Sequence, residues 1–269
     1  MLRRFSKLLT PFLSCLFVLG CVSKKHASLL PQALDGFNEV KSYEMDHSIY
    51  IAMAGTECLA HSQYRAPNLA RTEFTYPLSM SVVSDGKAIW GAIPDYNTCI
   101  RMPLDSEVGW LTPERILKLQ SPHLLLVGLL ESYDYKAVGV RGILCGKQKV
   151  VFKLTRKAPP ENPFQAPRAK VWIEKDTGLI TRIQNYDRRG ERKGRTRLGK
   201  YVEIDGIWLP REMRMEDRKG DLQALIQASN IVLNEPVPNE AFVYVPPDDM
   251  IVLDQLPEFG PPPEVLFLE

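Results

Sequence analysis

The stretch that decides the fold is "APNLARTEFTYPLSMSVVSDGKAIWGAIPDYNTC", from Ala66 to Cys99. It holds short runs of aromatic and branched residues that alternate with polar ones, which is typical of half-buried β-strands. Asp85-Gly86 stands between two such runs, and Asp-Gly in this position is the strongest short-range signal for a β-hairpin. The stretch therefore predicts consecutive antiparallel strands, with a tight turn at "SDGK", Ser84 to Lys87.

Similar patterns continue on both sides of this stretch. Upstream, "SYEMDHSIYIAM" places Tyr43, Met45, Ile49, Ile51 and Met53 on one side of a strand. Downstream, two further hairpins are predicted, with turns near Asp176 to Gly178 and at Asp205-Gly206. Other predicted strands are "TCIRMP", "LQALIQASNIVL" and "EAFVYVP". Many short strands separated by regular turns favour an antiparallel barrel or sandwich.

Helices are predicted in two places. "LLPQALDGFNEV" has Leu30, Leu34 and Phe37 at helical spacing, which predicts a short helix. In "LTPERILKLQSPHLLLVGLLESY", Thr112 is a suitable N-cap followed by Pro113 at the first helical position. The part "HLLLVGLL" is apolar around its whole circumference, so it must be enclosed by protein or lipid. Two interpretations stay open for it: an ordinary core helix, or a plug or lid over an apolar cavity.

The N-terminus predicts export and lipid anchoring. "MLRRFSK" is basic, and the apolar run from Leu8 to Gly20 has 13 residues. That is shorter than the roughly 20 residues of a membrane span but suits a secretory signal peptide. "VLGC" resembles the bacterial lipobox, so we expect residues 1–20 to be a signal peptide and Cys21 to be the acylated N-terminus of a tether over residues 21–29. More than one acyl chain gives stable anchoring.

Composition narrows the function classes. Loss of three basic residues with the signal peptide changes the formal charge from +2 to −1, which gives no electrostatic case for nucleic acid. The mature chain would keep Cys58, Cys99 and Cys145, whose pairing the sequence does not determine. We find no C-x-x-C pair, G-x-S-x-G, H-E-x-x-H or phosphate-binding glycine loop. His47 and His61 without a third ligand are weak evidence for metal. We therefore expect neither a metal nor a cofactor, and no enzyme.

The order and spacing of several motifs resemble the LolA/LolB family of bacterial lipoprotein carriers and receptors. The resemblance runs through the following residues: Pro67, Phe74, Pro77, Ser84, Asp85, Gly86, Lys87, Trp90, Pro94 and Asp95. "VWIEKDTGLITRIQNYDRRG", "YVEIDGIWLPREMRM" and "PNEAFVYVPPDDMIVLD" resemble later strands of related lipoprotein-sorting proteins. The resemblance covers residues 30–254, which we expect to form one domain before a Pro-rich tail at 255–269.

This resemblance implies a mainly β fold with a few helices. The expected architecture is an incomplete antiparallel β-barrel wrapped around plug or lid helices, enclosing a hydrophobic cavity for acyl chains. One position departs from the family: the soluble carriers have an arginine directly before the Pro-Asn-Leu turn, where this chain has Ala66. Arg65 is one residue away, and on a strand a one-residue shift turns a side chain to the opposite face.

The departure and the lipobox together favour a tethered lipoprotein over a freely diffusing carrier. Its expected partners are lipid acyl chains or lipoproteins, the membrane that holds its anchor, and a periplasmic carrier or another envelope protein. Val22 carries none of the inner-membrane retention signal known for many Gram-negative lipoproteins, so we expect the outer membrane, facing the periplasm. The alternative is a sensor or scaffold lipoprotein on the same fold that binds a protein partner.

Candidate site residues follow from this expectation. Acyl chains bind by apolar burial, so a cavity needs inward aliphatic and aromatic side chains, and methionine adapts to chains of different shape. The candidates for the cavity or its lid are Phe74, Met80, Trp90, Leu125, Leu126, Leu129, Trp172, Trp208, Met213 and Met215. Ordinary core packing is the alternative for each of them.

A basic run follows the second predicted hairpin strand. "RIQNYDRRGERKGRTRLGK" suggests a projecting hairpin, and its candidates for contact with anionic head groups are Arg188, Arg189, Arg192 and Lys193. Each basic side chain near an anionic membrane surface adds about 1 kcal/mol. A solvated loop is the alternative.

Overall fold

The computed structural model describes residues 26–104, 126, 129–142, 147–158 and 166–254. Most of them lie in one 14-stranded sheet. The first half of the chain supplies β1 (Ser42–Ile51), β2 (Thr56–Arg65), β3 (Leu69–Tyr76), β4 (Met80–Asp85), β5 (Ala88–Ile93) and β6 (Thr98–Pro103). The second half supplies β7 (Tyr133–Arg141), β8 (Lys149–Arg156), β9 (Arg168–Glu174), β10 (Ile180–Tyr186), β11 (Arg192–Ile204), β12 (Ile207–Asp217), β13 (Leu222–Leu233) and β14 (Ile251–Leu253).

The strand order joins the two halves of the chain in the middle of the sheet. From one edge to the other it is β14-β6-β5-β4-β3-β2-β1-β13-β12-β11-β10-β9-β8-β7. Among the described strands the neighbours are antiparallel, apart from the short parallel pair of β14 with β6. The two edge strands do not meet, so the sheet stays open. The predicted mainly β fold with an incomplete antiparallel barrel is confirmed.

The three predicted hairpin turns are confirmed, and local chemistry explains the first of them. Asp85 Oδ1 accepts hydrogen bonds from the backbone N–H groups of Lys87 (2.8 Å) and Ala88 (2.7 Å). Gly86 has φ +86°, a left-handed conformation that L residues rarely adopt, and a Cβ there would lie 3.3 Å from Leu69 Cδ2. The turns near Gly178 and at Asp205-Gly206 likewise connect β9 to β10 and β11 to β12.

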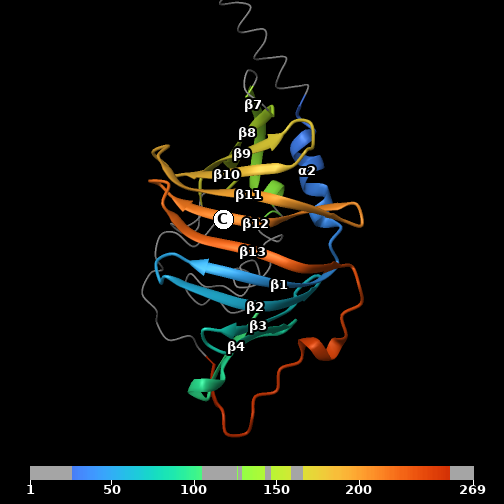
Figure 1. Ribbon diagram of the computed structural model, residues 1–269, viewed down its shortest axis with the longest axis vertical. Coiled ribbons are helices and arrows are strands. Elements are labelled where there is room, and N and C mark those ends of the chain that lie inside the picture. The colour runs from blue at the N-terminus through green and yellow to red at the C-terminus, as the bar shows by residue number, and fades with distance from the viewer. Residues whose placement is uncertain (1–25, 105–125, 127–128, 143–146, 159–165, 255–269) are drawn as a thin grey trace, which may run out of the picture.

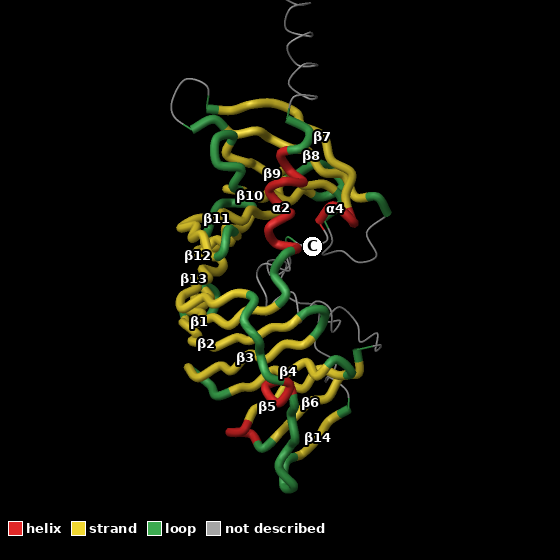
Figure 2. The backbone as a smooth tube through the Cα atoms, turned by 90° about the vertical axis from the view of Figure 1, so that its right-hand side faces the viewer, coloured by secondary structure: helices red, strands yellow, loops and turns green. Residues whose placement is uncertain are grey.

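The sheet bends into an arch, and helix α2 (Leu29–Asn38) lies inside the bend (Figure 2). As predicted, Leu30, Leu34 and Phe37 are its buried residues. The helix packs against β9 and β12, where Gly36 allows close approach to Ile207. We call the face of the sheet that carries Ile207 the concave face and the opposite one the convex face. Figure 1 shows α2 to one side of the stacked strands.

One predicted strand is wrong. "EAFVYVP" is not a strand: Asn239–Phe242 form the 3-10 helix η3, and no regular structure follows until β14. Prolines 238, 246 and 247 frame this segment, and proline has no N–H for a strand ladder. It packs instead on the convex face, where Arg65 and Arg71 donate hydrogen bonds to the carbonyls of Val237 (2.9 Å) and Ala241 (3.2 Å).

The predicted long helix at "LTPERILKLQSPHLLLVGLLESY" lies mostly outside the described residues. Its described end is the short helix α4 (Leu129–Ser132), which leads directly into β7. The predicted signal peptide (residues 1–20), the start of the tether and the tail at 255–269 also lie outside the described residues. Within the described part of the chain, no helix is both long and apolar enough to cross a membrane.

Candidate functional site

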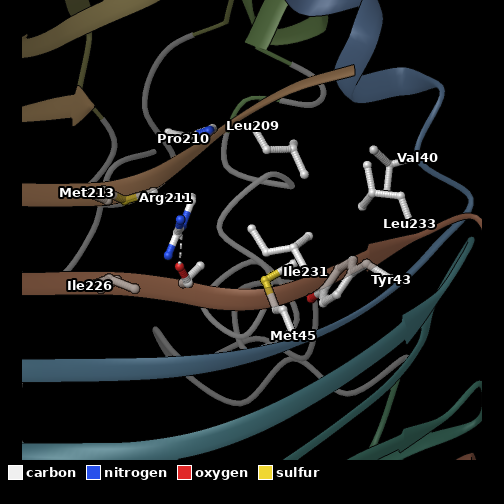
Figure 3. Close-up of a pocket in the computed structure, with 11 residues that line it drawn as sticks. Val40, Tyr43, Met45, Leu209, Pro210, Arg211, Met213, Ile226, Ile231 and Leu233 are labelled. Carbon is white, nitrogen blue, oxygen red and sulfur yellow. Dashed lines mark hydrogen bonds between the residues drawn. The ribbon is translucent and has the colours of Figure 1, made fainter. Parts of the chain in front are cut away.

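A mainly apolar pocket lies on the concave face where β1, β13 and β12 run side by side (Figure 3). Eleven of the described residues line it: Val40, Tyr43, Met45, Leu209, Pro210, Arg211, Met213, Ile226, Ala228, Ile231 and Leu233. Its cavity volume is only about 30 Å³. The pocket is therefore a narrow slot in this structure.

Strand alternation explains why apolar side chains converge here. The strand register places Tyr43 opposite Leu233, and Ile226 opposite both Ile49 and Met213. Residues directly opposite in an antiparallel pair point to the same face of the sheet. Tyr43 is 2% exposed and stacks on Tyr64, with the ring centroids 5.2 Å apart. Side chains from three strands thus form the floor, although they are far apart in the sequence.

The walls differ in how firmly they are held. Met45 and Met213 are buried, whereas Ile226, Ala228 and Ile231 are only partly buried and form the accessible rim. Methionine side chains have three rotatable bonds and adapt to irregular partners. The slot is therefore lined by side chains that can move apart without breaking the sheet.

Arg211 is the single charged residue among the eleven that line the pocket. It lies on β12 and is exposed to solvent. Its Nε donates a hydrogen bond to the carbonyl oxygen of Ala228 across the strand pair, at 3.1 Å, as Figure 3 shows. The neighbouring carboxylate of Glu212 is engaged elsewhere, because it pairs with Lys200 at 2.5 Å and accepts a hydrogen bond from Gln227 at 3.1 Å.

His47 is a buried polar residue beside this pocket. It lies on β1 opposite Ala228 of β13 and Ala60 of β2, and is 5% exposed. Neither ring nitrogen has a hydrogen-bond partner among the residues that the structure describes. Burial lowers the pKa of His47 to about 4, so its imidazole is neutral at physiological pH.

A second, wider hollow lies between α2, the β9–β10 turn and Trp208 of β12. Its cavity volume is about 490 Å³, but its lining mixes apolar residues with Glu39, Lys175 and Asp176. Polar groups around a binding site disfavour an extended apolar ligand, because they would lose water without gaining a partner. The slot under β1, β12 and β13 therefore has the lining that better suits apolar chains.

The candidate cavity residues from the sequence divide between the two faces of the sheet. Met213 lines the slot, and Met215 is buried next to it on the same concave face. Phe74 and Met80 pair with each other across β3 and β4, and the register through Ala60 places both on the concave face. They lie nearer the sheet edge and do not line the slot.

The three candidate tryptophans lie apart from the slot. Trp90 is on the convex face, where its Nε1 donates a hydrogen bond to Asp85 Oδ2 at 3.0 Å and its ring packs against Tyr244. Trp172 also lies on the convex face, beneath the guanidinium group of Arg182 at 5.0 Å. Trp208 is 43% exposed and borders the second hollow. The cause is the two-residue period of a strand, which sends each neighbour to the opposite face.

The candidates in the apolar helical segment are only partly described. Leu125 and Cys21, the predicted anchor residue, lie outside the described residues. Leu126 is 2% exposed and belongs to the main core. Leu129, in α4, is partly buried and packs against that core. None of these described leucines lines the slot.

The basic candidates occupy a tight turn and the strand that follows it. Arg188 and Arg189 are exposed in the β10–β11 turn, which is closed by a hydrogen bond from Asp187 N to Glu191 O at 2.9 Å. Arg192 and Lys193 begin β11, and Arg192 donates a hydrogen bond to the carbonyl of Arg218. Arg188 and Arg189 are thus the two candidates that lie in the turn itself.

Further along β11 the basic residues are held by one carboxylate on the convex face. The Glu216 side chain is 3% exposed and pairs with Arg195, with Arg197 at 3.2 Å and with Arg214 at 3.0 Å. Burial by itself raises the pKa of Glu216, but hydrogen bonds from Arg195 and Arg214 outweigh it and hold the pKa below its usual value. Glu216 therefore fastens β11 and β12 together.

The described cysteines are two free thiols. Cys58 is partly buried and Cys99 is fully buried, and burial raises the pKa of both thiols. Thiols of this kind are poor nucleophiles at neutral pH, and Cys145 lies outside the described residues. Within the described part of the chain, no group of three or more His, Cys, Asp or Glu side chains could hold a metal ion.

The slot also contains residues that the sequence analysis did not select, namely Leu209, Arg211, Ile226, Ile231 and Leu233. The alternation in "LQALIQASNIVL" marks a strand, but it does not show which strand lies beside it. Only the pairing of β13 with both β1 and β12 brings these residues to one place. Arg211 could have been noticed from the alternation in β12: Leu209, Arg211 and Met213 share one face, and Arg211 is the charged residue between two apolar ones.

The open antiparallel sheet bent around a helix defines the class of this chain as the LolA-like fold. A LolA superfamily protein from Nitrosomonas europaea superimposes with a TM-score of 0.55 at 16% identity, covering 81% of this chain and 97% of that one. A putative outer membrane lipoprotein-sorting protein domain from Vibrio parahaemolyticus gives 0.56 at 14%, covering 79% and 94%. A DUF1329 family protein from Desulfovibrio piger gives 0.59 at 19%, covering 83% and 98%.

Sequence comparison adds little to this class. The family whose model matches residues 128–244 is described only as an uncharacterized protein. No curated protein sequence matches the chain. The likeness to the three solved structures is one of fold, and the resemblance noted from the sequence motifs is thereby confirmed at that level.

Proposed function

We propose that this protein is a lipid-anchored envelope protein that binds acyl chains, of lipids or of lipidated proteins, in the slot between β1, β12 and β13. We place its role in lipoprotein sorting or lipid transfer at the outer membrane. The observation that carries the proposal is the slot itself, in which ten of the eleven lining residues are apolar or aromatic. The fold, the predicted lipobox at Cys21 and the apolar segment "HLLLVGLL" support it.

Burial of methylene groups supplies the binding energy in this proposal. Each buried CH₂ contributes about 0.8 kcal/mol, so a chain that enters the slot over part of its length binds measurably. Pockets for drug-sized ligands measure about 300–1,000 Å³, and this slot is much tighter. Binding must therefore widen it, through movement of the methionines and of the partly buried rim.

The first experiment identifies the ligand directly. The purified protein is extracted with organic solvent and the extract is analysed by mass spectrometry. We expect acyl lipids or lipidated protein in amounts comparable with the protein. An extract without lipid, together with a protein that binds no fluorescent lipid probe, would contradict the proposal and favour the scaffold alternative.

The second experiment places the ligand in the slot with a matched pair of variants on β13. Ala228→Phe puts an aromatic ring into the slot, whereas Ser229→Phe puts the same ring on the convex face one residue along. We expect Ala228→Phe to lower the affinity for a fluorescent fatty acid about tenfold or more, and Ser229→Phe to leave it nearly unchanged. Thermal melts of both variants show whether the fold is retained. Equal binding by two folded variants would remove the slot from the ligand site.

A further inference from the structure

Two polar side chains, those of Arg211 and His47, lie in one row across the concave face at the slot. Arg211 on β12, Ala228 on β13 and His47 on β1 follow one another on the concave face, and Ala60 on β2 comes next. Adjacent strands lie about 4.8 Å apart, so Arg211 and His47 start about 10 Å from each other. The two alanines leave this row low, because they carry only a methyl group. No large side chain of this row therefore stands between Arg211 and His47.

Arg211 has hydrogen-bonding capacity that the protein does not use. Its Nε is occupied by the Ala228 carbonyl at 3.1 Å. Its two terminal nitrogens form no hydrogen bond or ion pair with the described part of the chain, and its neighbour Glu212 is paired with Lys200. A guanidinium group held at its Nε presents its remaining N–H groups in a fixed fork that matches a carboxylate or a phosphate. Arg211 is the one cation among the described residues that line this apolar slot, and a cation at its mouth fits an anionic ligand.

His47 supplies the second observation. Its side chain is 5% exposed, and both of its ring nitrogens lack a partner among the described residues. Leaving a buried polar group without a hydrogen bond is unfavourable, and most buried polar groups in native proteins have a partner. A bound ligand is one way to supply the partner that His47 lacks here. Both ring nitrogens are buried in this structure, so a head group above Ala228 reaches the imidazole when the slot widens, as entry of an acyl chain also requires.

We propose that the slot takes an amphiphile with an anionic head group, a carboxylate or a phosphate, that Arg211 binds this head group, and that His47 donates a second hydrogen bond to it. This inference rests on the proposed function, because it assigns the ligand class of the same slot. The head group stays at the accessible rim, where Arg211 is exposed, and the acyl chain extends among the apolar residues. Acids are then preferred over esters and alcohols with the same chain.

The experiment uses the purified full chain and a neutral reporter, N-phenyl-1-naphthylamine, whose fluorescence rises in apolar sites. Three competitors with the same chain length displace it: palmitate, hexadecyl phosphate and hexadecanol. We expect the two anions to compete at concentrations about tenfold or more below that of the alcohol, as one charge-assisted interaction provides. A preference for palmitate over hexadecyl phosphate, or the reverse, identifies which head group the site takes.

Variants assign the preference to the proposed groups. Arg211→Gln is expected to bring palmitate and hexadecanol to equal potency, while Arg211→Lys keeps part of the preference. Arg218→Gln changes an exposed arginine in the turn directly after β12; it is the matched control and should behave as wild type. His47→Phe should weaken the binding of both anions and leave the binding of the reporter unchanged.

The outcomes separate this inference from the proposed function. If all three competitors displace the reporter equally from the wild-type protein, or if Arg211→Gln keeps the preference, the head-group assignment is wrong and acyl binding stands. If His47→Phe binds both anions like wild type, His47 is not part of the site. If neither the reporter nor any competitor binds, the proposed function fails as well.

Discussion

At the residue scale, the same side-chain type has opposite surroundings on the two faces of the sheet. Arg195, Arg197 and Arg214 on the convex face all pair with one buried carboxylate, that of Glu216. Arg211 is two residues before Met213 on the concave face and, among the described residues, it is bound only to a backbone carbonyl. Burial rather than residue type likewise separates the two histidines of β1 and β2. His61 is partly exposed and pairs with Asp46 at 2.8 Å, whereas His47 is enclosed.

His47 makes a testable contribution to the pH dependence of stability. Its folded-state pKa of about 4 lies below the ordinary value of 6.5. Desolvation is the main cause and the charge of His61 lowers the pKa a little further, whereas the charge of Asp46 raises it and offsets part of the shift. Between these two pH values the unfolded chain binds a proton that the folded chain does not, so stability falls as pH falls through this window. The loss amounts to about 3 kcal/mol for a shift of this size.

The measurement is a series of urea unfolding curves from pH 7 to pH 4, with His47→Phe beside wild type. We expect the free energy of unfolding of wild type to fall more steeply with decreasing pH than that of the variant, by about 3 kcal/mol over the range. His61→Phe serves as the control histidine on the other face. Parallel curves for wild type and His47→Phe would show that His47 is not held neutral by the fold.

At the element scale, helix α2 packs inside the arch and contributes buried side chains to the core. Its buried residues Leu30, Leu34 and Phe37 lie against strands β9 and β12, and the chain then continues through Val40 into β1. Val40 is also a wall of the slot. The helix therefore links one half of the core to the slot through a few residues of chain.

Leu34→Ala tests this role of α2. The side chain is 4% exposed, and truncation of a buried leucine costs about 2–5 kcal/mol, because the cavity closes only partly. We expect a loss within this range in the free energy of unfolding, measured by urea denaturation. Asp35→Ala, next along the helix and exposed, is the control and should change stability by about 0.5 kcal/mol or less. Equal effects of the two substitutions would mean that α2 is not part of the cooperative core.

At the scale of the whole molecule, the arch and its proposed anchor belong to one arrangement. Helix α2 begins at Leu29, eight residues after Cys21, so an acylated Cys21 would hold the domain close to the membrane surface. A tether of that length spans at most about 30 Å when fully extended. The slot would then work on lipids or lipoproteins that are presented near the same membrane.

The anchor prediction concerns the intact mass of the protein. Protein extracted with detergent from its native host should exceed the mass of the polypeptide from Cys21 to Glu269 by a diacylglyceryl group, usually with an additional amide-linked acyl chain. Cys21→Ala should abolish the increment and move the protein out of the membrane fraction, since the two or three acyl chains on Cys21 supply its attachment. An unmodified N-terminus at another residue would contradict the prediction.

The sequence by itself determined the local features of this protein. Asp-Gly turns, two-residue alternation and the spacing of Leu30, Leu34 and Phe37 depend on neighbours within a few residues, and the structure has the hairpins and the helix that they predict. "EAFVYVP" failed as a strand because its partner would have had to be a distant part of the sheet, and framing prolines favour a segment packed on the face instead. Local alternation could not distinguish the two outcomes.

Only the tertiary structure decided where the slot lies. The register of β13 between β1 and β12 sets Ile226 opposite Ile49 and Met213, and it brings Arg211 and His47 into one row. It also decided that Trp90 and Trp172 face away from the slot, although their apolar character suggested a cavity lining. Side-chain character is a property of each residue, but the face on which it lies depends on strand pairing. Strand pairing in turn depends on which register buries the apolar side chains of all the strands together.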